Sequence, residues 1–118
     1  MAVIYEVTLH ARAKIADAYL AWLREHVAAM LELQGFEGAE LHALEAVPAA
    51  QGGAGAGTTG CAEEAADERG WCVRYRLRDR AALDAYLHDH APRMRAEGIE
   101  RFGDAFRAER RILVPLDY

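Results

Sequence analysis

Hydrophobic and polar residues alternate along four short segments of the chain. Alternation with a period of two is typical of β-strands that have one face on a hydrophobic core. The segments span residues 3–10, 36–45, 71–77 and 108–114. The third is the clearest, because Trp, Val, Tyr and Leu alternate there with Cys and Arg. We therefore predict four strands, each with one face turned to a core.

Between the first two predicted strands the pattern changes to a helical period. Large apolar side chains recur at every third or fourth position over residues 11–33, so they would form one broad stripe on a helix. Gly35 follows, and glycine readily adopts the left-handed conformation that ends many helices. We predict one long amphipathic helix over this segment. Its stripe contains Ile15, Tyr19, Trp22, His26 and Met30.

A second helical stretch begins after Asp79, whose carboxylate can accept hydrogen bonds from the free N–H groups of a first helical turn. Pro92 interrupts this stretch, because proline has no amide hydrogen and is favoured at the start of a helix. We therefore expect one helix to end near His90 and a short second helix to follow. The apolar stripe continues through Met94, Ile99, Phe102 and Phe106.

Residues 47–69 break the pattern, because glycine, alanine and small polar residues leave little to bury. We predict a flexible loop within a single domain that spans residues 1–118. The loop contains the spacing G-x-G-x-x-G at residues 55–60, but no helix follows that could pack on a parallel sheet. A linker is therefore favoured over a dinucleotide site. A loop that orders on a protein partner is an alternative.

The predicted order of elements is β-α-β-β-α-β, which is the ferredoxin-like arrangement of the α+β class. Right-handed crossovers place both helical stretches on one face of a four-stranded antiparallel sheet. The other face is left open. Its predicted residues are Ile4, Glu6, Thr8, His10, Glu40, His42, Leu44, Cys72, Arg74, Arg76, Glu109, Arg111 and Leu113.

The open face concentrates acidic and basic side chains. Strands one and three are neighbours in the usual order of this fold, so Glu6 should lie near Arg74 or Arg76. Together with His42 and Arg111, these residues predict a pocket for a small polar or acidic ligand, with His42 or Glu6 as proton acceptor. A lattice of cross-strand salt bridges would have the same composition and is the competing interpretation.

Apolar residues on the same face suggest a second copy of the chain as a partner. Ile4, Leu44 and Leu113 would be buried if two sheets packed face to face across a two-fold axis. We therefore expect a homodimer that binds its ligand between the facing sheets.

Four further residues are candidates for chemistry. His26 lies on the apolar stripe of the first helix, either as an acid/base group in a cavity or as a packed core histidine. His88 and His90 are poorly spaced for one metal ion and are better placed at a helix C-terminus, so no metal site is expected. Cys72 lies beside Arg74, which could favour a thiolate. The chain does not contain a cysteine, a histidine and an acid in an order known from enzymes with a cysteine nucleophile.

Composition narrows the classes of function. The 118-residue chain has 14 basic and 19 acidic residues and a formal charge of −5, which disfavours nucleic-acid binding. No apolar run approaches the roughly 20 residues of a membrane span, and the N-terminus lacks the features of a signal peptide. Two cysteines do not make a disulfide framework. We expect a soluble, cytoplasmic protein that needs no cofactor.

Several segments together resemble a known family. They are Ile4-Tyr5-Glu6-Val7-Thr8-Leu9, Tyr19-x-x-Trp22-Leu23-x-x-His26, Gly35-Phe36-Glu37-Gly38-Ala39, Trp71-x-Val73-x-Tyr75, and Arg101-Phe102-Gly103-Asp104-x-Phe106-x-Ala108-x-Arg110-Arg111. The chain is similar over residues 1–46 and 70–115 to a small bacterial family of domains of unknown function. That family in turn resembles the dimeric α/β-barrel superfamily. The superfamily includes antibiotic-biosynthesis-type monooxygenases, whose turn after the first helix is similar to the one at Gly35, muconolactone-isomerase-like enzymes and stress-responsive barrels.

The resemblance implies a ferredoxin-like dimer but no particular catalytic residue, because the superfamily shares no catalytic set. Two functions therefore stand side by side. The first is a dimeric protein that binds a small ligand. The second is a cofactor-independent monooxygenase or isomerase for a small aromatic substrate, in which the protein supplies desolvation, orientation and a base.

Overall fold

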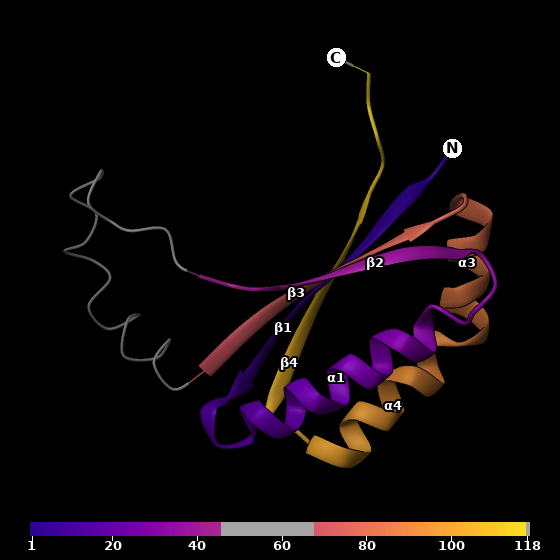
Figure 1. Ribbon diagram of the computed structural model, residues 1–118. Helices are drawn as coiled ribbons and strands as arrows, with labels where there is room; N and C mark the ends of the chain where they lie inside the picture. The colour runs from indigo at the N-terminus through magenta and orange to yellow at the C-terminus, as the bar shows by residue number, and fades with distance from the viewer. Residues whose placement is uncertain (46–67, 118) are drawn as a thin grey trace, which may run out of the picture.

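In the part of the chain that the structure describes, four strands and three α-helices follow one another in the predicted order. The computed structural model describes residues 1–45 and 68–117. The elements are β1 (Val3–Arg12), a 3-10 turn (Ala13–Ile15), α1 (Ala16–Met30), β2 (Phe36–Ala43), β3 (Glu68–Leu77), α3 (Arg80–Asp89), α4 (Ala91–Phe102) and β4 (Phe106–Leu113). The strands form one antiparallel sheet in the order β2-β3-β1-β4. The helices cover one face of this sheet, so the ferredoxin-like arrangement is confirmed (Figure 1).

Element boundaries differ from the predicted ones where pairing or turns take over. β1 continues past residue 10 because Ala11 and Arg12 still pair with β3, and Ala11 is fully buried. Helix α1 therefore starts at Ala16 rather than at residue 11, and it ends at Met30. The helix predicted after Pro92 is α4, which has 12 residues and is therefore not short. It has proline in its first turn, as expected.

The predicted loop at 47–69 falls largely outside the described residues. Its last two positions, Glu68 and Arg69, belong to β3 instead, which is three residues longer than the predicted strand. Both side chains make ion pairs there, Glu68 with Arg107 at 2.9 Å and Arg69 with Asp17 at 2.8 Å. Pairing with the extended end of β1 thus draws polar residues into the strand.

The two faces of the sheet have different partners. In β1 the side chains of Val3, Tyr5, Val7 and Leu9 are buried against the helices, together with alternate residues of β3. The intervening positions face the other side, as the alternation predicts. Tyr19 of α1 is 1 % exposed, and its ring lies within 6 Å of the rings of four aromatic residues. These four are Trp22, Trp71, Phe102 and Phe106.

The sequence predicts helix-end roles for Asp79 and Gly35. Asp79 caps α3 as expected, whereas Gly35 lies in a turn beyond α1. The Asp79 carboxylate accepts a hydrogen bond of 2.8 Å from the amide of Ala82, as an N-cap should. Gly35 has a φ of +91°, but it lies beyond a turn that follows α1 and leads into β2. Its carbonyl accepts a hydrogen bond of 2.8 Å from the amide of Arg78, which ties this turn to the end of β3.

A side chain at position 35 should destabilise the protein severely. A Cβ atom there would lie 2.5 Å from Cβ of Ala82, and the left-handed backbone adds strain for any L-residue. We expect Gly35→Ala to lower the free energy of unfolding by about 2–4 kcal/mol, as the combined cost of strain and overpacking. Urea denaturation of the purified variant measures the loss.

Gly38→Ala is the matched control. A Cβ atom at position 38 would meet only the flexible guanidinium of Arg76, at 3.4 Å, and the backbone φ there is not positive. This control should change stability by less than about 1 kcal/mol. Similar losses for both variants would mean that the contact with Ala82 does not limit this turn.

Candidate ligand-binding site

A row of alternating charges crosses the sheet on the face away from the helices. Pairing of the strands places Arg111, Glu6, Arg74 and Glu40 directly next to one another, from β4 through β1 and β3 to β2. Directly opposed residues in antiparallel strands point to the same side, so the four side chains share one face. The predicted proximity of Glu6 and Arg74 is thereby confirmed.

Glu6 is the only buried charged residue among those that the structure describes, with 1 % of its surface exposed. Two guanidiniums cover it. Nε of Arg74 donates to Oε2 at 2.8 Å, and Nε of Arg111 donates to Oε1 at 2.6 Å. Burial by itself would raise the pKa of Glu6, but the hydrogen bonds from Arg111 and Arg74 outweigh it and hold the pKa below its ordinary value. The carboxylate is therefore ionised and fully paired at neutral pH.

The remaining predicted residues of this face lie at its margin. His42 and Arg76 have side chains that are 57 % exposed. Nε2 of His42 lies 3.6 Å from the carboxylate of Glu40, and Nε of Arg76 lies 3.7 Å from that of Glu37. Arg76 therefore already has a partner of opposite sign in the same chain.

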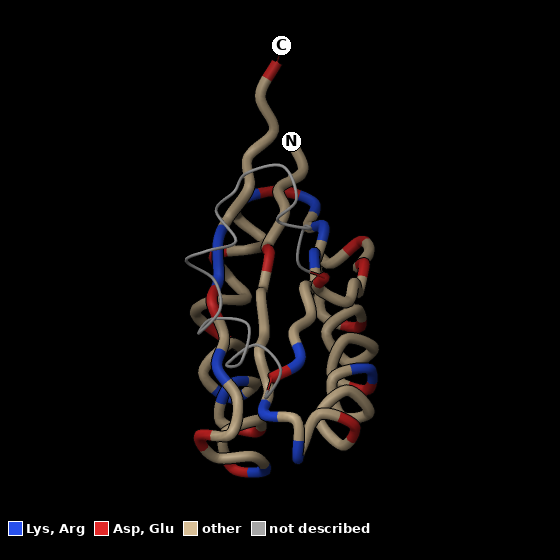
Figure 2. The backbone as a smooth tube through the Cα atoms, turned by 90° about the vertical axis from the view of Figure 1, so that its left-hand side faces the viewer, with Lys and Arg blue, Asp and Glu red and all other residues tan. Residues whose placement is uncertain are grey.

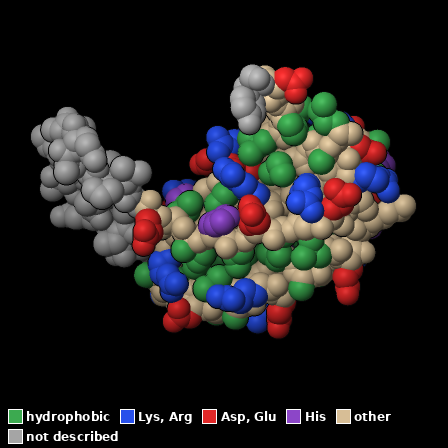
Figure 3. All heavy atoms as spheres, turned by 45° about the horizontal axis from the view of Figure 1, so that its top comes forward, with side chains coloured by type: hydrophobic (Ala, Val, Ile, Leu, Met, Phe, Trp, Pro, Cys, Tyr) green, Lys and Arg blue, Asp and Glu red, His purple; other side chains and the backbone are tan. Residues whose placement is uncertain are grey.

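Charges of both signs are interspersed over the molecule. Figure 2 shows basic and acidic positions mixed along the strands and helices. Figure 3 shows hydrophobic, positive and negative side chains next to one another on the surface in view. A mixed surface of this kind offers no strong field for a polyanion.

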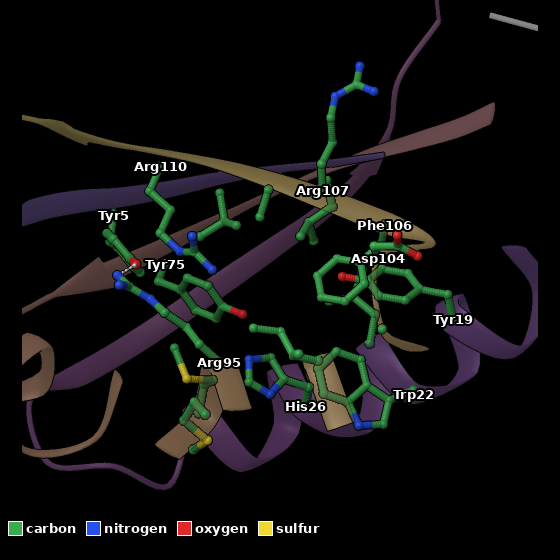
Figure 4. Close-up of a pocket in the computed structure, with 18 of the residues that line it drawn as sticks. Tyr5, Tyr19, Trp22, His26, Tyr75, Arg95, Asp104, Phe106, Arg107 and Arg110 are labelled. Carbon is green, nitrogen blue, oxygen red and sulfur yellow. Dashed lines mark hydrogen bonds between the residues drawn. The ribbon is translucent and has the colours of Figure 1, made fainter. Parts of the chain in front are cut away.

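A cavity of about 550 Å³ lies on the opposite side of the sheet, between its helix-facing side and helices α1 and α4 (Figure 4). Such a volume is in the usual range for sites that bind small molecules. Its walls are mostly aromatic and aliphatic side chains. The exposed residues Arg95, Ile99 and Asp104 are part of the lining, so the cavity communicates with solvent.

Helical and strand periodicity bring the lining together. On α1, Tyr19, Leu23 and His26 stand one turn apart and face the sheet. On β4, the alternate residues Phe106, Ala108 and Arg110 face the helices, opposite Ala11, Leu9 and Val7 of β1. β4 is an edge strand, and its small Ala108 leaves space beneath the helices. Gly98 of α4 is buried, and a Cβ atom there would lie 3.2 Å from Trp22 and 3.3 Å from Phe106, so α4 approaches both rings closely.

The cavity has an aromatic end and a basic end. Figure 4 shows Tyr19, Trp22 and Phe106 at one end, near Asp104, and Tyr5 and Arg95 at the other, with Arg110 on the same side as Tyr75. Arg95 donates a long hydrogen bond of 3.5 Å to the hydroxyl of Tyr5.

His26 lies between these two ends. Its ring stacks on that of Trp22, with centroids 4.8 Å apart and an angle of 17° between the planes. Burial lowers the pKa of His26, and the Arg110 charge lowers it further, whereas Glu97 raises it. The imidazole is therefore neutral at pH 7 and can accept a proton. Both interpretations of His26 therefore apply, because its ring packs on Trp22 and also lines the cavity.

Tyr75 and Tyr86 of the cavity keep their protons. Burial raises the pKa of Tyr75 far above its usual value and that of Tyr86 to about 12. Their hydroxyl groups therefore act as neutral hydrogen-bond donors and acceptors at physiological pH.

The other candidate residues lie apart from the cavity. His88 contacts Asp89 at 2.7 Å and His90 contacts Arg93 at 3.3 Å, so the two histidines engage different partners at the end of α3. Within the described ranges, no group of three His, Cys, Asp or Glu side chains is placed to hold a metal ion. Burial raises the pKa of Cys72, with a further contribution from Glu6, so its thiol is not activated.

The structure thus divides the predicted site residues between two surfaces. Glu6, His42, Arg74, Arg76 and Arg111 share the open face, whereas His26 lines the cavity. Sequence reasoning did not single out the basic residues of the cavity. One signal was available for Arg110, because it shares the helix-facing side of the last predicted strand with Ile112. Arg95 had no such signal, because charged residues are common on amphipathic helices.

Loss of the Glu6 charge should reduce stability in a pH-dependent way. We expect Glu6→Gln to lower the free energy of unfolding at pH 7 by about 1–2 kcal/mol, because two hydrogen bonds lose their charge assistance. The folded-state pKa of Glu6 lies below its unfolded value, so its contribution is fully present above about pH 4.5 and is lost as the pH falls through the folded-state pKa. Urea denaturation from pH 7 to pH 3 should show the two proteins converging.

Glu40→Gln provides the control on the same row. The Glu40 side chain is 69 % exposed, and within the described residues its one ion-pair contact is with His42, at 3.6 Å. Its removal should change stability by no more than about 0.5 kcal/mol. Equal effects of the two substitutions would contradict the assignment of Glu6 as the paired, buried charge of this face.

Solved structures of several other proteins share this fold. Rv0793 from Mycobacterium tuberculosis superposes with a TM-score of 0.61 and 21 % identity, covering 100 % of this chain and 98 % of that one. A mutant of SnoaB, a cofactor-independent oxygenase from Streptomyces nogalater, gives 0.60 and 9 % identity, with coverage of 98 % and 95 %. A putative antibiotic biosynthesis monooxygenase from Bacillus cereus gives 0.54 and 9 %, with coverage of 99 % and 96 %. At these identities the likeness concerns the fold alone.

Family membership rests on the sequence. No curated protein matches the chain. No helix in the described part of the chain has the length and apolar character needed to cross a membrane. A family model matches residues 2–116, which is nearly the whole chain. The protein belongs to the family described as Domain of unknown function (DUF4286).

Proposed function

We propose that the protein binds a small planar aromatic molecule in the cavity between the sheet and helices α1 and α4. The observation that carries this proposal is the cavity of about 550 Å³, walled by Tyr, Trp and Phe rings together with Leu, Ile and Met side chains. Aromatic rings gain from stacked and edge-to-face contacts with other rings, beyond the area that they bury. The few polar groups at one end would orient the ligand.

A neutral aromatic dye should bind in this cavity. N-phenyl-naphthylamine fluoresces strongly in apolar surroundings, so titration of the protein should give a saturable increase with one site per chain. Ala108→Phe places a phenyl ring in the cavity from β4, and we expect it to weaken binding at least about tenfold. Fluorescence titration with both proteins measures the difference.

Ala85→Phe is the matched control, since Ala85 is exposed on α3 and is not part of the cavity wall. It adds the same ring at the surface and should leave the affinity within a factor of about two. Absence of saturable binding, or equal binding by the Ala108→Phe variant, would overturn the proposed function. Melting temperatures of the variants establish that both remain folded.

A second candidate function is favoured by the position of His26. A neutral imidazole in the cavity could accept the proton of a phenol or quinol, and the resulting anion could react with dioxygen without a cofactor. The fold is also that of SnoaB, a cofactor-independent oxygenase. Oxygenation is therefore a further proposal, which requires the binding proposed above. Isomerisation of a small aromatic substrate is its alternative.

Oxygen uptake should depend on His26. A panel of two- and three-ring phenols and quinols, without added metal or flavin, should contain a substrate that consumes dioxygen faster with protein than without. We expect His26→Phe, which keeps a ring on Trp22, to lower that rate about a hundredfold. The wild-type rate should persist at pH 6.5 and fall only at lower pH, because burial holds the pKa of His26 below its ordinary value and its base form therefore survives further acidification.

His10→Phe serves as the control, because His10 lies on the open face of the sheet and does not line the cavity. Its oxygen uptake should match that of the wild type. A panel without any protein-dependent uptake, or a His26→Phe variant at the wild-type rate, would rule out the oxygenase candidate and leave the binding proposal untouched.

The open face supports a separate proposal about assembly. We propose that two copies of the chain pack with these faces together, which would enclose the ionic row and bury Ile4 and Leu113, neighbours in the β1–β4 pairing. A small polar or acidic ligand between the sheets would then meet Glu6, His42, Arg74, Arg76 and Arg111. The cavity beneath the helices is the better supported site, because Arg74, Arg76 and Arg111 of the open face already have acidic partners.

A further inference from the structure

We propose that the ligand of the helix-covered cavity is an aromatic anion, and that Arg95 and Arg110 hold its carboxylate or phenolate group. This inference rests on the proposed function, because it assumes that an aromatic molecule occupies the cavity. It adds the charge of the ligand and the two residues that recognise it. Neither arginine was singled out by the sequence.

The first support is the lack of an acidic partner for either arginine. Among residues 1–45 and 68–117, no carboxylate lies within ion-pair distance of the guanidinium of Arg95 or Arg110. Most of the other described arginines do have such a partner. These are Arg69, Arg74, Arg76, Arg78, Arg80, Arg107 and Arg111. Arg12, Arg24, Arg93 and Arg101 also lack an acidic partner within the described residues, but of these six arginines only Arg95 and Arg110 line the cavity.

The second support is that the guanidiniums of Arg95 and Arg110 act on the same part of the cavity, around Tyr86. Burial raises the pKa of Tyr86, and the charges of Arg95, Arg110 and Arg93 lower it; of these three, Arg95 and Arg110 line the cavity. Arg110 also acts on the pKa of His26, across the cavity. A group bound near Tyr86 would therefore feel both guanidiniums. Arg95 reaches this region from α4 and Arg110 reaches it from β4, so a ligand there would bridge the two elements.

Hydrogen-bond donors surround the same position. The hydroxyl of Tyr5 accepts the bond from Arg95, which leaves its own proton available for an acceptor. Guanidinium groups donate to carboxylates and phenolates in charge-assisted hydrogen bonds, which are about twice as strong as neutral ones. The basic end of the cavity therefore offers an oxyanion several donors and a net positive charge.

The opposite end favours the same orientation. Asp104 lies near Phe106 and Tyr19, away from Arg95 (Figure 4). Its carboxylate would repel an anionic group from that end, while Trp22 and Phe106 would contact the rings. A cationic ligand would place its charge at the Asp104 end, and the two guanidiniums without an acidic partner would repel it from the cavity. Charge and shape together thus select an aromatic anion over its neutral or cationic counterparts.

The test compares two ligands of nearly the same shape. Naphthoate carries a carboxylate, and naphthamide replaces it with a neutral amide of similar size. Each competes with N-phenyl-naphthylamine for the cavity, so one fluorescence signal reports both affinities. We expect naphthoate to bind at least about tenfold more tightly at low ionic strength. Added salt should reduce this preference, because the mouth of the cavity reaches solvent.

Substitutions identify the residues responsible. Arg110→Gln and Arg95→Gln should each weaken naphthoate about fivefold to tenfold and leave naphthamide unchanged. Arg110→Lys keeps the charge and should retain most of the preference. Arg24→Gln removes an arginine that is exposed on α1 and is not part of the cavity wall, so it should have no effect.

Each outcome separates the two proposals. If the dye binds but naphthoate and naphthamide compete equally, or if the preference survives both glutamine substitutions, the two arginines are only solvated surface cations and this inference fails alone. If the dye itself does not bind, the proposed function fails. Dye binding by each variant also shows that its cavity is intact, so a loss confined to naphthoate cannot come from misfolding.

Discussion

Every side chain of the sheet is assigned to one of its faces by the pairing of β1. This strand is hydrogen-bonded to β3 on one side and to β4 on the other, so its residues can point only toward the helices or away from them. A shift of one residue in register would expose Tyr5 and Val7 and turn Glu6 into the core. Both changes would cost free energy, so the register is fixed. The fixed register determines which residues form each of the two surfaces that carry candidate chemistry.

The two faces that result have opposite electrostatic character. On the open face, Glu6 pairs with both Arg74 and Arg111 and neutralises them in part. On the covered face, the rings of α1 and β4 enclose an apolar space, and the arginines at one end have no acidic partner within the described residues. An arginine that lines a cavity without an acidic partner is a stronger indication of a ligand than an arginine that already has such a partner.

The cavity exists because the helix layer does not fill the space over the edge strand. Ala108 is small, Arg110 is long and ends in a charge, and neither packs as a large core residue would. Close approach of α4 to Trp22 and Phe106 at Gly98 narrows the space at the aromatic end instead. The same geometry places the neutral imidazole of His26 between the rings and the basic end, where a bound aromatic molecule would meet both.

Much of the architecture follows from local patterns in the chain. Alternation predicted the four strands and the face of each residue, and the strand order of the fold then brought Glu6 next to Arg74. The N-cap at Asp79 and the break at Pro92 were equally local, because each depends on one side chain and the nearest turn of backbone. Boundaries such as the start of α1 were not, since pairing with β3 carries β1 on to Arg12.

The cavity was decided by tertiary structure alone. Its lining comes from helices and strands far apart in the chain, and no periodicity states how closely two layers approach one another. Tyr5, Tyr75 and Tyr86 read as ordinary core residues, and Arg95 reads as a surface residue of an amphipathic helix. Only the packed arrangement shows that these residues face a common space, because an unfilled volume is a property of the distances between elements and not of any one of them.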